Sequence, residues 1–466
     1  MAQLLGTWEG PAPAYEALAE RIRILIIDGR IAVHTWLPSE RELAQAIGRS
    51  RTTVISAYRL LREQGYLISS RGAGSSAILP PATGSQSSVD PGAVIDLSRA
   101  ALPMWPELPG ILADVTASFN ARNAGLGFDL LGHPSLRRRI ADHYAEQGLP
   151  TSPSQVMVTL GAQHAIALSA RALLTRGDRV LLESPTYPHA YEALHNAGGR
   201  PVTVSVNSAG WDLPGFAATV ESFRPAVAYL MPDFHNPTGA SMDLSTREEI
   251  VRLAGRAGTV LLIDETTRDL AIDRVERHRP LAALTDNDAA VVTIGSTGKS
   301  VWGGLRVGWI RADEQLIHRL ATIRAAQDMG TPTIDQLVTA ELFPRMGEVL
   351  EHRTKQLRSS RQLAGHLLAK HLPGWQVPLT PGGVAFWVGL GSPQSSALTL
   401  AARTKGVHLT AGPRFSVDGA FERNLRIPFT GHLDDLHTGV PLLEDAWRSL
   451  GDHQGLKNGI TLDQVV

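Results

Sequence analysis

Two side chains in the C-terminal half of the chain have types and settings that suit covalent chemistry on a small molecule. Lys299 lies in the Gly-rich stretch GSTGKSVWGGLRVGW, and its amine can attack a carbonyl group. Asp264 follows the apolar run VLLI, where a buried acid is costly unless it has a partner. Near the lysine, the Ser296 hydroxyl and the Arg306 guanidinium suit a phosphate group. These residues predict a binding site that combines an amine, an acid and groups that hold an anion.

Three further motifs follow strand-like runs. Gly161, Ala162 and Gln163 stand before a helix start, where backbone N–H groups and the helix dipole can hold a phosphate. Tyr187 in ESPTYP can stack on a flat cofactor, and Asn236 in HNPTG offers an amide to a ligand oxygen. Taken singly, each motif has an ordinary alternative, such as a core tyrosine or a common α/β loop. Together they predict a pyridoxal 5′-phosphate (PLP) site, because PLP needs a lysine, an acid at its ring nitrogen, a ring platform and phosphate ligands.

The chain that carries these motifs alternates apolar runs with helical stretches. This alternation is typical of a mainly parallel α/β sheet, in which ligands bind beyond the carboxyl ends of the strands. The apolar runs lie at 156–159, 180–183, 202–205, 227–230, 260–263, 291–294 and 307–310.

A separate unit of under eighty residues precedes this region. Residues 13–28 place apolar side chains on one helical face, and Ser39 with Glu42 matches a capping box at the start of a second helix. Ser50 is the cap candidate for a third helix over about 51–64, and two short strands around a Gly-rich turn follow. The predicted inward-facing residues of the first and third helices are Tyr15, Leu18, Ala19, Ile22, Leu25, Ile26, Val54, Ala57, Tyr58 and Leu61. This order of elements predicts a winged helix-turn-helix.

The third helix of such a unit enters the major groove of DNA with its N-terminal residues at the base edges. Those residues are Ser50, Arg51, Thr52 and Thr53. An arginine can form two bonds to guanine, and hydroxyl groups can contact phosphates or bases. Over 49–71, five arginines stand against one glutamate. A solvated helical surface would also carry arginines, but the complete arrangement favours binding to double-stranded DNA.

The composition limits the other function classes. The 466 residues include 44 Lys and Arg against 45 Asp and Glu, so nucleic acid can bind only at a local basic patch. Cysteine is absent from the sequence, which excludes disulfides, thiolate zinc sites and Fe–S clusters. Neither a membrane span of ~18–20 apolar residues nor a secretory signal pattern is present, so we expect a cytoplasmic protein without membrane contact.

One composition shift divides the chain. Residues 79–94, LPPATGSQSSVDPGAV, are rich in Pro, Gly and Ser and lack an apolar period. We interpret them as a flexible linker, although a long surface loop within one domain is the alternative. The predicted domains are therefore a DNA-binding domain over 1–78, called the reading head below, and a cofactor-binding region over 95–460.

The reading head resembles the DNA-binding domain of the GntR family of bacterial regulators, through the segment LPSERELAQAIGRSRTTVISAYRLLREQGYLISSRGAG. One departure is the run AVHTW, where the family commonly has an LPPG-like turn, and we expect it to change a surface turn and not the DNA contacts. The resemblance implies that these residues contact DNA: Arg41, Arg51, Thr52, Thr53, Arg71 and Gly72.

The region over roughly 95–450 resembles a fold-type I aminotransferase, through GFDLLGHPSLRRRIA, TLGAQHAI, ESPTYP, HNPTG, IDE and the lysine-bearing stretch. The resemblance implies a large mainly parallel α/β domain plus a smaller α+β domain. It also implies that Lys299 forms the internal aldimine and that Asp264 pairs with the pyridine nitrogen. Asn236 would donate to the O3′ oxygen, and Tyr187 would stack on the ring. The implied phosphate ligands are Ser296, Arg306 and the amides of Gly161, Ala162 and Gln163.

The segment GPRFSVDGAFERNLRIPF resembles the one that supplies an arginine for the substrate carboxylate. Arg426 is the match and Arg414 is a second candidate. Two departures concern the cofactor. Thr266 and Thr267 stand where members commonly have a tyrosine that bonds O3′, so we expect a raised aldimine pKa. Gly298 stands where many members have a serine before the lysine. We expect both departures to impair transamination more than cofactor binding.

A GntR-like domain joined to an aminotransferase-like region resembles the MocR/GabR family of bacterial regulators, over about residues 13–450. The resemblance implies a transcriptional regulator that binds a DNA operator and senses an amino compound, or PLP itself, through an aldimine at Lys299. It also implies a homodimer with head-to-tail subunits. The alternative is a genuine aminotransferase with an autoregulatory or vestigial DNA-binding domain. The sequence leaves open the effector, the operator and the direction of regulation.

Overall fold

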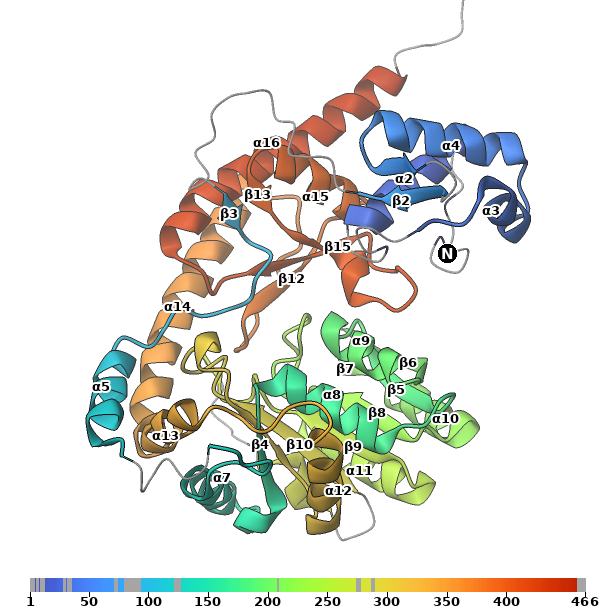
Figure 1. Ribbon diagram of the computed structural model, residues 1–466. Coiled ribbons are helices and arrows are strands. Elements are labelled where there is room, and N and C mark those ends of the chain that lie inside the picture. The colour runs from blue at the N-terminus through green and yellow to red at the C-terminus, as the bar shows by residue number, and fades with distance from the viewer. Residues whose placement is uncertain are drawn as a thin grey trace, which may run out of the picture.

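The computed structural model describes residues 5, 8, 13–27, 31, 36–70, 74–78, 94–120, 127–207, 209–273, 278–285 and 290–458. They form the reading head, a large α/β domain and a small α+β domain (Figure 1). Over this part of the chain, every helix is too short or too polar to cross a bilayer. The predicted linker, apart from Val94, and the wing-tip residues Arg71 and Gly72 lie outside the described residues.

The reading head has the predicted order of capped helices and wing. The Ser39 hydroxyl accepts the Glu42 N–H at 3.3 Å and the Glu42 carboxylate accepts the Ser39 N–H at 2.9 Å, so the predicted capping box is confirmed. The Ser50 hydroxyl caps the next helix by accepting the Thr53 N–H at 3.1 Å. The elements are α2 (Ala14–Ile27), α3 (Glu40–Ile47), α4 (Arg51–Glu63) and the antiparallel strands β1 (Leu67–Ser70) and β2 (Gly74–Ala77).

The core of the reading head lies between α2 and α4, whose predicted apolar faces meet. On α2, Tyr15 is half-buried and the other predicted positions are fully buried. The Tyr58 hydroxyl of α4 donates to the Pro38 carbonyl at 2.9 Å, which fixes α4 against the start of α3. The buried predicted residues are Leu18, Ala19, Ile22, Leu25, Ile26, Val54, Ala57, Tyr58 and Leu61.

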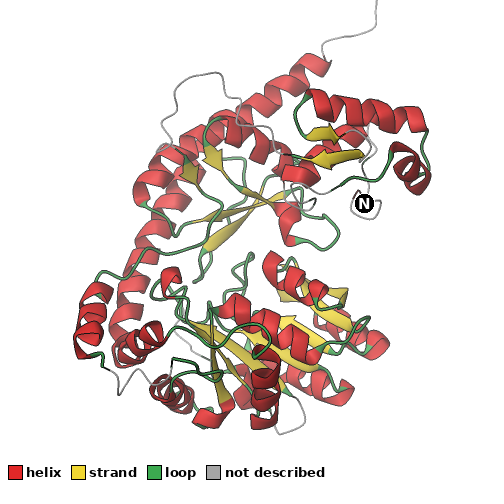
Figure 2. Ribbon diagram, viewed as in Figure 1, coloured by secondary structure: helices red, strands yellow, loops and turns green. Residues whose placement is uncertain are grey.

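An eight-stranded sheet forms the centre of the large domain (Figure 2), in the order β4-β11-β10-β9-β8-β5-β6-β7. The central strands β6, β5, β8, β9 and β10 are parallel, whereas β11 and β7 run antiparallel to their neighbours. The predicted mainly parallel sheet is therefore confirmed. The strands are β4 (Val156–Thr159), β5 (Arg179–Ser184), β6 (Arg200–Asn207), β7 (Gly210–Trp211), β8 (Val227–Leu230), β9 (Val260–Asp264), β10 (Val291–Ser296) and β11 (Gly308–Arg311).

Helices cover both faces of this sheet, which explains why its strands read as continuous apolar runs. Buried residues of α8, α9 and α12 pack on one face, and those of α10 and α11 pack on the other. The helices are α5 (Leu108–Ser118), α7 (Pro134–Glu146), α8 (Ala162–Leu173), α9 (Pro188–Asn196), α10 (Leu213–Phe223), α11 (Leu244–Ala257), α12 (Glu314–Arg324) and α13 (Thr333–Leu342). Short 3₁₀ turns lie at Pro153–Gln155, Leu281–Leu284, Gly303–Leu305 and Phe343–Arg345.

The small domain combines residues from both sides of the large domain in the sequence. Strand β3, which follows the predicted linker, pairs in parallel with β13, and β12-β15-β14 form an antiparallel sheet. Its elements are β3 (Ile95–Asp96), α14 (Met346–His371), β12 (Ala385–Gly389), α15 (Ser395–Thr404), β13 (Val407–His408), β14 (Thr410–Ala411), the 3₁₀ turn η5 (Gly412–Phe415), β15 (Asn424–Pro428) and α16 (Leu433–Asn458).

The reading head rests on the small domain (Figure 1). Helix α2 packs against α15. The Arg21 guanidinium lies 3.9 Å from the Glu422 carboxylate, and both side chains are partly buried. This contact joins two units that lie far apart in the sequence.

Candidate cofactor site and DNA-reading face

The strand ends of the large domain bring the predicted cofactor residues to one cavity of about 220 Å³. Parallel strands place their carboxyl ends at one edge of the sheet, so motifs that follow different strands meet there. Thr266, Thr267 and Gly298, which differ from the residues that aminotransferases commonly have at these positions, also line the cavity. The predicted residues that line it are Gly161, Ala162, Gln163, Tyr187, Asn236, Asp264, Ser296, Lys299 and Arg306.

Lys299 follows β10, and its amine donates to the Ala100 carbonyl. Desolvation in the cavity lowers the pKa of Lys299 to about 8, and the nearby positive charge of Arg426 adds to this effect. The negative charge of Asp264 acts in the opposite direction. A substantial fraction of the amine is therefore neutral near pH 8, and the neutral amine is the form that attacks a carbonyl.

Asp264 ends β9 and is 2% exposed. Its Oδ1 accepts the Thr266 N–H at 2.9 Å and its Oδ2 accepts the Tyr229 hydroxyl at 2.7 Å. Burial raises the pKa of this carboxyl, while those two hydrogen bonds and the charge of Lys299 lower it. The sequence motifs do not include Tyr229 as a site residue. The strand pairing explains its place, because Tyr229 pairs with Leu262, and Asp264 lies two residues after Leu262 on the same face of the sheet.

The start of α8 forms an anion cradle. Gly161, at φ +81°, precedes the helix, and no side chain caps the first turn. Arg306 also has a left-handed backbone, at φ +52°, and its Nη2 donates to the Leu160 carbonyl at 2.9 Å. A Cβ at Gly161 would stand 3.3 Å from that Nη2, so the glycine admits the guanidinium. The Gly161 N–H itself donates to the Thr159 carbonyl at 2.8 Å, so the predicted phosphate contact of this amide is not supported. The N–H groups of Ala162 and Gln163, the helix dipole and the guanidinium converge at the cradle.

The Ser296 hydroxyl already has two protein partners. It donates to the Val307 carbonyl at 3.0 Å and accepts the Gly298 N–H at 3.0 Å. A Cβ at Gly298 would stand 3.2 Å from this hydroxyl oxygen, so the glycine keeps the turn uncrowded. The Thr267 hydroxyl donates to the Asp233 carbonyl at 2.7 Å, away from the cavity.

Arg426 of β15 lies behind the cavity and is 8% exposed. Its Nη1 donates to Asn236 Oδ1 at 3.3 Å, its Nη2 donates to the Ser98 carbonyl, and its Nε is buried without a partner. The guanidinium carbon lies 4.9 Å from the centre of the Phe415 ring. Burial lowers the pKa of Arg426 to about 10, so it remains a cation at neutral pH. Because Arg426 holds the Asn236 oxygen, the Asn236 amide N–H₂ is available to a ligand.

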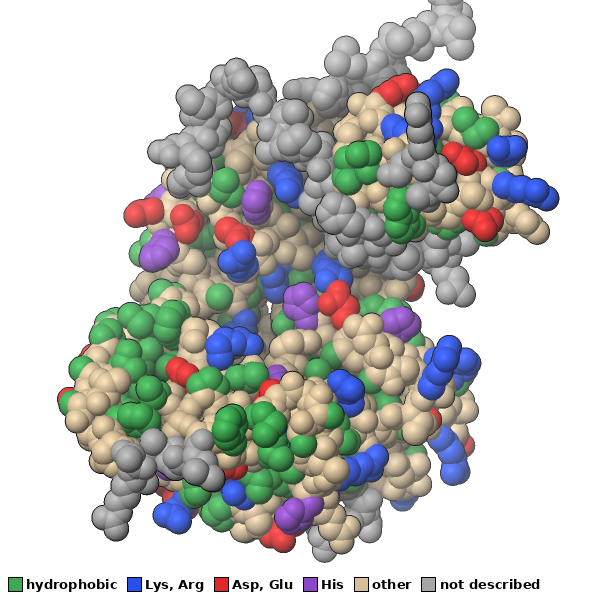
Figure 3. All heavy atoms as spheres, viewed as in Figure 1, with side chains coloured by type: hydrophobic (Ala, Val, Ile, Leu, Met, Phe, Trp, Pro, Cys, Tyr) green, Lys and Arg blue, Asp and Glu red, His purple; other side chains and the backbone are tan. Residues whose placement is uncertain are grey.

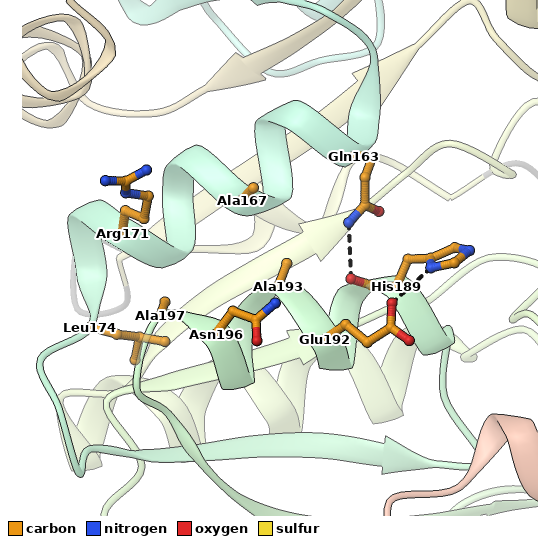
Figure 4. Close-up of a pocket in the computed structure, with 9 residues that line it drawn as sticks. All are labelled: Gln163, Ala167, Arg171, Leu174, His189, Glu192, Ala193, Asn196 and Ala197. Atoms are coloured by element: carbon orange, nitrogen blue, oxygen red, sulfur yellow. Dashed lines mark hydrogen bonds and ion pairs between the residues drawn. The ribbon is translucent and has the colours of Figure 1, made fainter. Parts of the chain in front are cut away.

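The second carboxylate candidate, Arg414, has a different place. It forms an ion pair with Glu192 of α9. Neither arginine lines the cavity directly, but Arg426 bonds to Asn236, which does, and its charge acts on Lys299. Glu192 lines a groove of about 640 Å³ between α8 and α9, together with His189, whose Nδ1 lies 2.9 Å from Glu192 Oε2 (Figure 4). Gln163 crosses this groove and donates to the His189 carbonyl at 2.9 Å. The structure therefore brings Arg426, and not Arg414, to the lysine.

PLP fits this donor set. The cavity holds an amine, a carboxylate and an anion cradle, which are the groups that different parts of that cofactor need. Two buried polar atoms beside it, Gln163 Oε1 and Arg426 Nε, lack a protein partner. A buried donor or acceptor without a partner is costly, so a polar ligand that reaches these atoms is favoured.

The start of α4 presents the predicted DNA contacts to solvent. Ser50, Arg51 and Thr52 are exposed, and Arg41 of α3 is exposed as well. Thr53 is half-buried, and its N–H and hydroxyl both contact the Ser50 hydroxyl.

Arg62, one of the five arginines in residues 49–71, has a structural role. Arg62 Nη1 donates to the Ser69 and Ser75 hydroxyls at 3.3 Å and 3.2 Å and braces the wing. Arg41 and Arg51, which are exposed, are the predicted DNA-contacting arginines that lie within the described residues.

Two family models match the chain. Residues 114–439 match aminotransferase class I and II, and residues 14–76 match the bacterial regulatory proteins of the gntR family. The two matches fall on the sheet-bearing domains and on the reading head, respectively.

Relatives include regulators that match most of the chain and an aminotransferase that matches about three quarters of it. The chain is 27% identical to the HTH-type transcriptional regulator YisV of Bacillus subtilis, over 94% of this chain and 96% of the relative. It is 27% identical to the probable rhizopine catabolism regulatory protein MocR of Rhizobium meliloti, over 79% of each. The α-aminoadipate aminotransferase LysN of Thermus thermophilus, solved with N-(5′-phosphopyridoxyl)-L-leucine, is 26% identical and superimposes with a TM-score of 0.72, over 78% of this chain and 94% of that structure.

Proposed function

The chain belongs to the aminotransferase class I and II family and carries a GntR-family domain before that region, and on this premise we propose that it is a PLP-dependent transcriptional regulator. It binds an operator in double-stranded DNA and senses an amino compound, or PLP itself, at Lys299. The observation that carries the proposal is the presence of both machineries in one chain. A capped helix presents Arg51 to solvent, and nine predicted cofactor residues line one cavity.

PLP supplies a carbonyl that condenses with amines and a ring that withdraws electrons. Lys299 provides the amine that anchors it, and Asp264 holds a proton at the ring nitrogen. The Asn236 amide donates to the ring oxygen, and Tyr187 covers the ring. The N-terminus of α8 and Arg306 hold the phosphate.

Arg426 selects ligands that carry a carboxylate. A carboxylate that approaches the guanidinium competes with the Ser98 carbonyl for Nη2 and gains the unpartnered Nε. This exchange replaces a neutral acceptor by a charged one, and a planar fork suits a carboxylate in two-point contact. An amino compound with a carboxylate therefore binds better than a simple amine.

One short segment of the small domain connects the ligand site with the reading head. It begins at Arg414 and ends at Arg426. Between them, Glu422 accepts the Ser396 N–H at 3.0 Å and faces Arg21 of α2 at 3.9 Å. A ligand that repositions this segment can change the position of the reading head. The size of the shift in this equilibrium is set by the difference between the ligand's affinities for the two positions of the reading head.

The proposed assembly is a homodimer with head-to-tail subunits. Exposed apolar side chains lie in and around α5 and α13, where green surface gathers at the lower left of Figure 3. Apolar patches of this kind mark protein–protein interfaces. The exposed residues are Met104, Leu112, Phe119, Phe128, Met329 and Ile334.

Absorption spectroscopy tests the sensing half of the proposal. The PLP-loaded full-length protein is titrated with a panel of amino acids and amines, and keto-acid product is assayed in the same samples. We expect a shift of the visible band without sustained product. Steady keto-acid release in the presence of an acceptor would instead support the alternative, a genuine aminotransferase, which the presence of Lys299, Asp264 and Arg426 keeps open.

Selection from a random-sequence duplex library tests the DNA-binding half. We expect the full-length protein to enrich one motif, and Arg51→Ala to lose that enrichment while keeping its visible spectrum. Lys299→Ala is the matched control, because it removes the cofactor anchor and leaves α4 intact. If neither the unaltered protein nor the Lys299 variant enriches a sequence, the regulator proposal is wrong.

A further inference from the structure

Both oxygens of the Asp264 carboxylate accept hydrogen bonds, and the donors come from two different places in the chain. The Thr266 N–H, from the turn directly after β9, reaches Oδ1 at 2.9 Å. The Tyr229 hydroxyl, from the neighbouring strand β8, reaches Oδ2 at 2.7 Å. A carboxylate with both oxygens bonded cannot turn about its Cβ–Cγ bond without losing a hydrogen bond. Its plane is therefore fixed before any ligand arrives.

The place of Tyr229 in the sheet explains why it reaches this carboxylate. Tyr229 pairs with Leu262 across β8 and β9, and Asp264 lies two residues later on the same face. Both residues are buried, at 0% and 2% exposure. The ring of Tyr229 packs within the apolar core between the sheet and α8. Phenylalanine would fill the same core space, so the hydroxyl group requires a separate explanation.

The electrostatics of the pair allow Tyr229 to act only as a donor. Burial and the negative charge of Asp264 raise the pKa of the Tyr229 phenol well above its ordinary value. The phenol therefore keeps its proton at every accessible pH. A hydrogen bond donated to a carboxylate stabilises the ionised form, and this effect opposes the rise that burial imposes on the pKa of Asp264.

We propose that Tyr229 is a positioning residue, which holds Asp264 ionised and in the orientation that pairs with the ring nitrogen of the cofactor. The inference rests on the proposed function, because it requires a PLP ring beside Asp264. Thr266 and Thr267 provide no phenol at this site, and Thr267 donates elsewhere. Tyr229 supplies a phenolic donor to the acid itself.

The test removes a single oxygen atom. Tyr229→Phe is compared with Tyr144→Phe, which removes an equally buried phenol oxygen whose partner is the Trp309 indole N–H at 3.0 Å. The readouts are the dissociation constant for PLP, the ¹⁵N chemical shift of the ring nitrogen in labelled PLP, and the thermal midpoint of the full-length protein.

We expect Tyr229→Phe to weaken PLP binding by about ten- to a hundred-fold, as the loss of a hydrogen bond to a charged group predicts. The ring nitrogen signal moves toward the unprotonated position. In an Asp264→Asn background the same change costs little, because the partner charge is gone. Tyr144→Phe lowers the thermal midpoint but leaves the nitrogen signal in place.

Two results separate the possible failures. If the unaltered protein binds PLP and Tyr229→Phe leaves both its affinity and the nitrogen signal unchanged, the assignment of Tyr229 is wrong and the proposed function stands. If the unaltered protein does not bind PLP, the proposed function fails and the inference fails with it.

Discussion

Replacement of Arg426 by glutamine separates carboxylate recognition from amine recognition. The variant Arg426→Gln keeps a donor near Asn236 but removes the cation that faces the ligand site. We therefore expect amino acids to bind more weakly, while amines without a carboxylate keep their affinity. The contrast between these two ligand classes is the quantity of interest, because general damage to the site would weaken both.

The magnitude follows from the present partners of the guanidinium. A ligand carboxylate exchanges the Ser98 carbonyl for a charged acceptor at Nη2 and adds a partner at the unused Nε. One exchanged and one new hydrogen bond to a charged group together contribute about 2–4 kcal/mol. The loss in amino-acid affinity is then roughly thirty-fold to several hundred-fold.

The assay is a titration of the visible band with one amino acid and with the amine that lacks its α-carboxylate. The matched control is Arg414→Gln, because Arg414 pairs with Glu192 outside the cavity and should leave the ratio of the two affinities unchanged. Equal losses for both ligands in Arg426→Gln would refute the reasoning. A carboxylate-specific loss in Arg414→Gln would instead transfer the role to Arg414.

Three further outcomes are expected. Arg51→Ala weakens binding to the selected duplex by about 1–3 kcal/mol, measured by fluorescence anisotropy. Arg59→Ala has a smaller effect, because the Arg59 side chain lies 4.0 Å from Glu63. Equal effects of the two substitutions would contradict the assignment of Arg51 to DNA contact. The rate of PLP uptake rises with pH through about 8, because the neutral form of Lys299 is the nucleophile, and a rate that stays flat from pH 6.5 to 9.5 would argue against a lowered pKa. Ser39→Ala removes the cap of α3 and costs about 1 kcal/mol, which speeds amide exchange in that helix without altering the PLP spectrum; unchanged exchange would show that the capping box contributes nothing.

Local patterns in the sequence anticipated much of the fold. The capping box of Ser39 and Glu42 and the cap at Ser50 involve residues three apart, so spacing alone reveals them. The apolar runs mark the strands because both faces of a parallel sheet are buried. The nine predicted residues of the cofactor cavity follow the same logic, since each ends a strand or stands in the segment beyond one.

Contacts between distant segments were decided by the tertiary structure. Tyr229 meets Asp264 through strand register, and no motif records that register. The sequence gives Arg426 as the match and Arg414 as a second candidate, and the structure separates them. Strand β15 places Arg426 against Asn236 at the cavity, whereas Arg414 pairs with Glu192 of α9.

The sequence by itself thus determined which elements form and which chemical groups stand at their ends, because caps, turns and apolar periods depend on neighbours along the chain. Only the tertiary structure decided which of those groups meet. Arg62, which the sequence counts only in the basic charge of residues 49–71, braces the wing through Ser69 and Ser75. Arg21 faces Glu422, which lies about four hundred residues away in the sequence. Such pairs depend on how whole elements pack, and packing is a property of the folded chain.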